Sequence, residues 1–294
     1  MKVLDLEPGK YVLAISGGVD SMVLLDIIRK QSNVKLVLAH FNHGIRADSH
    51  KDELLVKQTA KLNCNILELG NGYLGHGASE DLARNERYRF LESIAQKHNA
   101  GGIVTAHHQD DLIETAFLNI LRGTGYRGLT AIYVNSKIQR PLIKISKHEI
   151  LKYAKSNGLK WHEDSTNQDM NYLRNYVRKY VMPKLNKKDR QQIVKIVEDV
   201  AIRQSKIEKD LATMSQFNSL NSIDRQQFIN LPVKVSNELL TYRLRRLGLK
   251  DYDKKTIERL SVAIKTAFPG TSYDVKNKFW LKFGLKTAQL TDSS

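Results

Sequence analysis

The stretch that decides the fold is Ser16-Gly17-Gly18-Val19-Asp20-Ser21. An apolar run, Tyr11–Ile15, precedes it, and a segment with helical spacing, Met22–Lys30, follows it. Two adjacent glycines let the backbone turn sharply and approach a ligand closely. Free amides in such a turn, together with the amino end of a helix, favour an anion such as phosphate. The stretch therefore predicts a phosphate-binding turn between a first strand and a first helix.

The first half of the chain continues this alternation of strand-like and helix-like segments. Further apolar runs lie at residues 35–40, 64–69 and 102–106, and helical patterns lie at 48–62, 79–99 (with Ser79 as a capping residue) and 109–122. Strands that alternate with helices of this length predict a doubly wound, mostly parallel α/β sheet. Ligands bind such sheets beyond the carboxyl ends of the strands, where we expect the polar clusters to converge.

The second half of the chain predicts a smaller domain. Arg140–Ile143 indicates a further strand or an extended link, residues 146–215 are mainly helical in pattern, and Thr271–Phe283 indicates a hairpin among helices. We expect a catalytic domain at 1–185, a helical connector at 186–215 and a small, basic, mainly helical domain at 216–294.

Acidic side chains in the polar clusters indicate Mg²⁺. Asp20 adds negative charge to an anion-binding turn, and a Mg²⁺ ion that bridges Asp20 and phosphate oxygens would resolve this conflict. Asp111 and Glu114 share a helix face and offer further oxygen ligands, although helix capping by Asp110 and Asp111 is the alternative. Two histidines beside two aspartates also suggest zinc, but four contiguous side chains at 107–111 cannot surround one ion.

Basic side chains form three groups along the chain. Arg84 and Arg87 lie in a charged helix, which is ordinarily a solvated face. Residues 121–129 combine three glycines with Arg122 and Arg127 and predict a mobile loop that closes over substrate. Residues 171–180 interleave basic and aromatic side chains, which suits either RNA binding or an amphipathic helix.

The whole chain is basic. Its formal net charge is +16, from 47 Lys+Arg against 31 Asp+Glu over 294 residues. Such an excess attracts polyanions, of which nucleic acid is the commonest, and solubility is the alternative explanation. No apolar run reaches the roughly 18 residues of a membrane span, and the first ten residues do not resemble a signal peptide. Cys64 is the only cysteine, so no intramolecular disulfide forms and a cytoplasmic location is expected.

Taken in order, these segments resemble the tRNA(Ile)-lysidine synthetases, members of the PP-loop superfamily of ATP pyrophosphatases. The strings that carry the resemblance are Ser16–Ser21; Ala39–Arg46; Glu80, Arg84, Arg87 and Tyr88; Ala106–Gly128; Arg140-Pro141-Leu142; Glu163-Asp164-Ser165; and Arg174-Asn175 with Arg178. The resemblance covers residues 11–185 closely. Leu112 and Thr166 depart from the family pattern, and Leu112 puts a minor polar contact in doubt.

The resemblance implies that ATP adenylates the 2-keto oxygen of the wobble cytidine in a CAU-anticodon isoleucine tRNA, after which free L-lysine displaces AMP to form lysidine. It implies ATP contacts at Ser16, Gly17, Gly18, Val19, Asp20, Ser21, Ala39 and His40. It implies tRNA or substrate contacts at His43, Arg46, Arg84, Arg87, Glu114, Arg122, Arg127, Arg174, Asn175 and Arg178. Expected catalytic residues are Asp20, His107, Asp110 and Asp111, with Mg²⁺ on Asp20 and Asp111. A homodimer is a further expectation.

Two alternative interpretations of the function stay open at this point. Another PP-loop enzyme that modifies tRNA is one alternative, although a thiolase of the tRNA cytidine type normally needs paired cysteines. A non-catalytic RNA-binding protein with a degenerate nucleotide site is another, against which the intact turn and Asp110-Asp111 argue.

Overall fold

The computed structural model describes residues 3–44, 49–62, 66–72, 80–133, 138–162, 173–215, 219–249, 252–276 and 279–292. The chain divides into two compact units, Met1–Ala201 and Ile202–Ser294. The 29-residue helix α8 (Lys187–Ser215) runs through the division, within the range expected for a connector. None of the helices in the described ranges is both long and apolar enough to cross a membrane.

A five-stranded parallel sheet forms the centre of the first unit. The strands are β1 (Gly9–Ala14), β2 (Val34–Asn42), β3 (Ile66–Asn71), β4 (Gly102–Val104) and β5 (Ile138–Gln139), in the order β3-β2-β1-β4-β5. Strand β1 is central because its side chains are apolar on both faces, as buried parallel strands require. The predicted doubly wound α/β fold is therefore confirmed.

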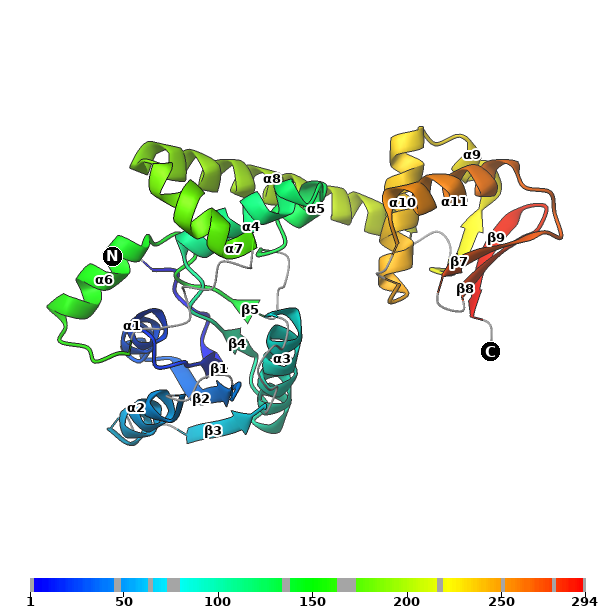
Figure 1. Cartoon of the computed structure of the whole chain (residues 1–294). Helices are drawn as coiled ribbons and strands as arrows, with labels where there is room; N and C mark the ends of the chain where they lie inside the picture. Colours follow the sequence, from blue (N-terminus) through cyan, green and yellow to red (C-terminus); the bar gives the residue numbers. More distant parts are fainter. Residues whose placement is uncertain are drawn as a thin grey trace. The chain divides into compact units, whose positions relative to one another are not determined.

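Helices cover both faces of this sheet (Figure 1). On one face, Leu13 packs with α1 (Val19–Ile28), α2 (Ser49–Leu62) and α6 (Lys147–Ser156). On the other face, Val12 packs with Leu91 of α3 (Glu80–Lys97). Alternation of side chains along the strand sends neighbouring residues to opposite faces. Because β1 and β4 are parallel, the loops that follow them leave the sheet at the same edge, between the two helical layers.

A third apolar cluster supports the far side of this edge. It joins α4 (Gln109–Leu121) to the short helix α7 (Leu173–Tyr176), the π-helical turn η2 (Val177–Val181), the 3₁₀ turn η3 (Met182–Lys184) and the start of α8. Helix α5 (Tyr126–Leu129) also packs on α4. This cluster fixes the α4 helix, which carries the acidic residues of the site.

One local prediction needs correction. Arg140–Ile143, expected to be a further strand or an extended link, is not a strand: β5, two residues long, lies earlier in the chain, and residues 141–144 form turns. Pro141 cannot donate an amide to a ladder, which explains why the strand ends before it. The start of the third strand expected at Cys64 lies outside the described residues, and β3 is described from Ile66. The predicted cap at Ser79 lies outside the described residues.

The second unit combines helices with a small antiparallel sheet. The helices are α9 (Arg225–Ile229), α10 (Val233–Arg246) and α11 (Lys254–Thr266); the strands are β6 (Ser222–Asp224), β7 (Ser272–Lys276), β8 (Phe279–Phe283) and β9 (Thr287–Asp292), in the order β6-β9-β8-β7. The hairpin expected at Thr271–Phe283 is confirmed as β7 and β8. Strands β6 and β9 were not expected from the sequence.

Candidate functional site

The turn after β1 is shaped by its glycines and serines. Gly17 has a φ of +84°, a conformation that side chains rarely adopt, and a Cβ there would lie 3.4 Å from Asp52. The Ser21 hydroxyl donates to the Gly18 carbonyl at 2.9 Å, and the Ser16 amide donates to the Ser21 oxygen at 3.2 Å. Helix α1 starts directly afterwards, so its amino end faces the space that the turn encloses.

Asp20 lies in the first turn of α1 and is held from a distant part of the chain. The Lys147 ammonium donates to both carboxylate oxygens of Asp20, at 2.6 and 2.8 Å. Lys147 is placed by a capping box, in which Ser146 and Glu149 define the start of α6. The sequence shows that helix start, but it contains no signal for a contact across 127 positions.

His108 brings the turn after β1 and the loop after β4 together. Its Nε2 atom lies 3.7 Å from an Asp20 oxygen and 3.6 Å from an Asp111 oxygen. His108 and Asp111 also form a capping box at the start of α4, so the capping alternative is real for Asp111. Burial alone would raise the pKa of Asp111, but His108, His107 and the His108 amide together hold it below the ordinary value. Asp20 and Asp111 are thus neighbours, as expected.

The other acidic residues of α4 have arginine partners. Asp110 accepts a hydrogen bond from Arg190 of α8 at 2.7 Å, and sequence reasoning missed Arg190. Glu114, which is 5% exposed, accepts from the Arg178 Nε at 2.8 Å, and Arg174 lies 3.9 Å away. Burial raises the pKa of Glu114 despite the opposing effect of Arg178. Glu114 Oε2 is buried and makes no hydrogen bond to any residue in the described ranges.

Two histidines near the sheet edge are kept neutral. Burial, reinforced by Arg140, Arg84 and Arg87, lowers the pKa of His107 to about 3, although Asp111 opposes this. The Thr105 hydroxyl lies 2.8 Å from the His107 Nδ1. Burial also lowers the pKa of His43 to about 4, with Arg87 and His40 contributing.

Some of the other residues predicted for the site lie at this edge of the sheet, and the rest lie elsewhere. The His40 Nδ1–H donates to the Ile15 carbonyl at 2.9 Å, and Ala39 packs in the core. Arg122 caps the carboxyl end of α4, roughly 20 Å along the helix from His108 at its amino end, and Arg127 lies in the following helix α5. Asn175 lies in α7. Arg46 lies outside the described residues.

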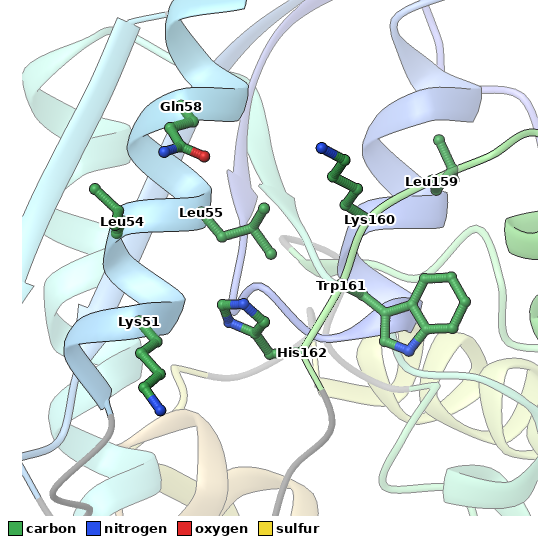
Figure 2. Close-up of a pocket in the computed structure, with 8 residues that line it drawn as sticks. All are labelled: Lys51, Leu54, Leu55, Gln58, Leu159, Lys160, Trp161 and His162. Atoms are coloured by element: carbon green, nitrogen blue, oxygen red, sulfur yellow. The ribbon is translucent and has the colours of Figure 1, made fainter.

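A cavity of about 530 Å³ adjoins the turn on the side of α2 (Figure 2). Side chains of α2 line one wall, and the extended segment Leu159–His162 lines the other. The His162 amide donates to the Gly17 carbonyl at 3.1 Å, and the His162 Nδ1 lies 3.0 Å from an Asp52 oxygen. These contacts tie the segment after α6 to the turn. No pattern in the sequence predicted this cavity.

The described residues contain no cluster of three or more His, Cys, Asp or Glu side chains arranged to hold a metal ion. The two carboxylates that flank His108, those of Asp20 and Asp111, are residues at this edge that could hold a Mg²⁺ ion. Two carboxylates are sufficient for Mg²⁺ only when substrate phosphates and water complete its octahedral shell.

Comparison with known proteins places the first unit in a family. Residues 2–185 match the model of the PP-loop domain. The chain is 36% identical over 189 residues to a protein named tRNA(Ile)-lysidine synthase from Thermotoga sp. (strain RQ2), covering 60% of this chain and 46% of that protein. It is 41% identical over 185 residues to the protein of that name from Caldanaerobacter subterraneus subsp. tengcongensis, covering 59% and 40%. It is 28% identical over 292 residues to the protein of that name from Francisella tularensis, covering 95% of this chain and 72% of that protein.

The chain spans about half the length of most of the curated relatives it matches. Among solved structures, the U34-tRNA thiolase NcsA from Methanococcus maripaludis has a TM-score of 0.56 at 20% identity, covering 67% of this chain and 72% of that one. At this identity the likeness concerns the fold. Because the family model covers more than half of the residues, the chain belongs to the PP-loop domain family.

Proposed function

We propose that this protein joins lysine to carbon 2 of the wobble cytidine in an isoleucine tRNA with a CAU anticodon, at the expense of ATP. The observation that carries the proposal is the approach of Asp20 and Asp111 to the same atom, His108 Nε2, at 3.7 and 3.6 Å. This contact unites the phosphate-binding turn with an acidic helix start at one sheet edge. Similarity to proteins named tRNA(Ile)-lysidine synthase and the net charge of +16 support an RNA substrate.

The first step of the proposed reaction is adenylation. The cytidine O2 attacks the α-phosphorus of ATP, the bond from that phosphorus to the bridging oxygen breaks, and pyrophosphate leaves. The amides of Gly17 and Gly18 and the amino end of α1 stabilise the negative charge that grows on the leaving group. Lys147 is close enough to share this task, because its ammonium already binds the neighbouring Asp20.

Asp20 and Asp111 are the residues that would hold Mg²⁺ with the nucleotide. When bound, the ion would neutralise phosphate charge and stabilise the departing pyrophosphate. The Lys147 ammonium is the cation that faces Asp20 in this structure, and it compensates the Asp20 charge.

The second step is attack by lysine. The ε-amine of lysine bonds to carbon 2, the bond from carbon 2 to the adenylated oxygen breaks, and AMP leaves with the electron pair. Asp111 supplies negative charge that selects a cationic amino acid. Glu114 Oε2, which makes no hydrogen bond in the described residues although Arg174 lies 3.9 Å away, offers an acceptor for its ammonium. The amine must lose a proton to become a nucleophile. Of the three candidates His107, Asp110 and Asp111, Asp110 is already engaged by Arg190.

We also propose that the protein acts in the cytoplasm. The homodimer stays a prediction. Release of pyrophosphate tests the first step, because AMP stays on the cytidine until lysine displaces it. Purified protein is mixed with ATP, Mg²⁺ and either the CAU isoleucine tRNA transcript or the same transcript with a GAU anticodon. We expect pyrophosphate with the CAU transcript only, even without lysine, and AMP only when lysine is added. Pyrophosphate with both transcripts, or without RNA, would contradict adenylation of the wobble base.

A further inference from the structure

Three arginines gather at the α3 side of the sheet edge. Arg84 and Arg87 lie in the first turns of α3, and their guanidinium carbons lie 5.0 and 5.6 Å from the centre of the Tyr88 ring. Arg140 follows β5 and is adjacent to Tyr88. Among the side chains that the structure describes, which do not include those of Glu80 and Asp81, no carboxylate lies within 4.0 Å of any of these three guanidinium groups. We call Arg84, Arg87, Arg140 and Tyr88 the arginine cluster.

Two polar atoms of the cluster are buried and make no hydrogen bond of ordinary geometry in the described residues. The Tyr88 hydroxyl and the Arg140 Nε are both inaccessible to solvent, and neither has a hydrogen bond that meets ordinary geometry within the described residues. The Arg140 Nη1 donates only to the Ile138 carbonyl, at 3.2 Å. Buried donors without acceptors are costly, so their retention indicates that a ligand supplies the acceptors.

The positive charges of the cluster also act on one another. Burial lowers the pKa of both Arg87 and Arg140, and Arg84 lowers each further, although Tyr88 opposes the change at both and Asp111 opposes it at Arg87. Like charges brought together in a partly buried place repel one another. An anion would relieve this repulsion, and three guanidinium forks match the oxygens of a phosphate group better than those of a single carboxylate.

The position of the cluster decides which phosphate it suits. Helix α3 packs on the sheet face opposite to α1, and α1 carries the turn that suits the phosphates of a nucleotide (Figure 1). His107 lies at the sheet edge between α1 and α3, and the charges of all three arginines lower its pKa. A substrate strand that reaches this edge from the α3 side would place its backbone on the cluster.

We propose that Arg84, Arg87, Arg140 and Tyr88 form a binding subsite for one phosphodiester of the RNA backbone, next to the base that reacts. This inference rests on the proposed function, because it assumes an RNA substrate. It assigns Arg140 and Tyr88 to the binding site and gives Arg84 and Arg87 a shared ligand. The subsite would fix the position of the strand but would not read its sequence.

The test compares Arg140→Gln with the wild type. Affinity for a 17-nucleotide stem–loop with a CAU anticodon is measured by fluorescence anisotropy across a salt series, and ATP affinity is measured separately. Arg140→Gln should weaken RNA binding about tenfold and make the salt dependence shallower by about one counterion, with ATP affinity unchanged. Arg89→Gln, which removes an exposed arginine paired with Glu86 on the same helix, serves as the matched control.

A second arm locates the phosphate. Stem–loops with a neutral methylphosphonate at one loop position at a time are bound to both proteins. One position should weaken binding to the wild type and to Arg89→Gln, but not to Arg140→Gln. A loss of ATP affinity without a loss of RNA affinity would assign the cluster to the nucleotide and overturn the proposal, as would equal losses at every position in both proteins.

Stability separates a binding role from a structural one. Because Arg140→Gln relieves repulsion, its Tm without RNA should equal or exceed that of the wild type. A lower Tm would show that the guanidinium supports the fold, and would overturn the assignment. If the wild type binds the stem–loop with this pattern but transfers no lysine, the proposed function fails while the subsite stands.

Discussion

The Asp20 carboxylate is the point at which the turn, α4 and α6 meet. It contacts Lys147 directly and lies within 3.7 Å of His108. We expect Asp20→Ala to reduce tRNA-dependent AMP formation about 100- to 1,000-fold, the loss typical of one charge-stabilising group. The affinity for tRNA should not change. Asp199→Ala, which removes an exposed acid from α8, is the control. Normal turnover by Asp20→Ala, measured by AMP chromatography, would remove Asp20 from the mechanism.

The half-buried histidines His107 and His43 predict a pH dependence of stability. The pKa is about 3 for His107 and about 4 for His43 in the folded chain, against an ordinary value of 6.5. As pH falls below 6.5, the unfolded chain takes up protons at these positions and the folded chain does not. Stability that is present above pH 6.5 is therefore lost progressively towards pH 4.

Each histidine should contribute about 1 kcal/mol of this loss per pH unit between pH 6 and 5. Urea unfolding of the wild type and of His107→Gln at several pH values measures the slope. The variant should show a shallower slope than the wild type, whatever its stability at pH 7.5. Parallel slopes would mean that His107 is solvated and titrates normally.

At the scale of elements, the amino end of α4 has a structural and a chemical task. Loss of a side-chain cap costs roughly 0.5–2 kcal/mol of stability, which we expect for His108→Ala. Asp253→Ala, which uncaps α11 in the second unit, is also expected to lower stability. AMP formation should fall in His108→Ala alone, because only His108 lies beside Asp20 and Asp111. Equal activity in the two variants would reduce His108 to a capping residue.

The sequence predicts elements well where the pattern is local. The apolar run before Ser16 and the glycines after it were enough to place β1, the turn and α1. Strand β5 was misplaced because two residues at a sheet edge carry too little periodicity to detect. Strands β6 and β9 were missed because β6 is short and β9 has only two apolar residues, Ala288 and Leu290.

Contacts between distant elements were beyond prediction from the sequence. Asp20, Asp110 and Glu114 were singled out individually by their types and positions. Lys147, the partner of Asp20, and Arg190, the partner of Asp110, were not singled out, because 127 and 80 residues separate them from these acids. Such pairs depend on how helices pack, and a single sequence contains no record of that packing. The same reason hid the cavity beside α2 and the grouping of Arg140 with α3.

At the scale of the whole molecule, the net charge of +16 predicts a strong salt dependence of RNA binding. Each phosphate that is neutralised releases a counterion, and six to ten such contacts would lower affinity about 10³- to 10⁵-fold between 50 and 200 mM salt. Titration of the full chain with the CAU transcript over this range measures the slope. A flat response would mean that the basic excess serves solubility and not binding.

Transfer of lysine to tRNA tests the central claim most directly. Radiolabelled lysine is incubated with the full chain and the CAU isoleucine tRNA transcript, with and without ATP, and acid-precipitable label is counted. We predict label on the RNA only when ATP is present, and none when Asp20→Ala replaces the wild type. Absence of label with a folded, ATP-binding wild-type chain would contradict the assignment of lysine as the nucleophile and of this tRNA as the substrate.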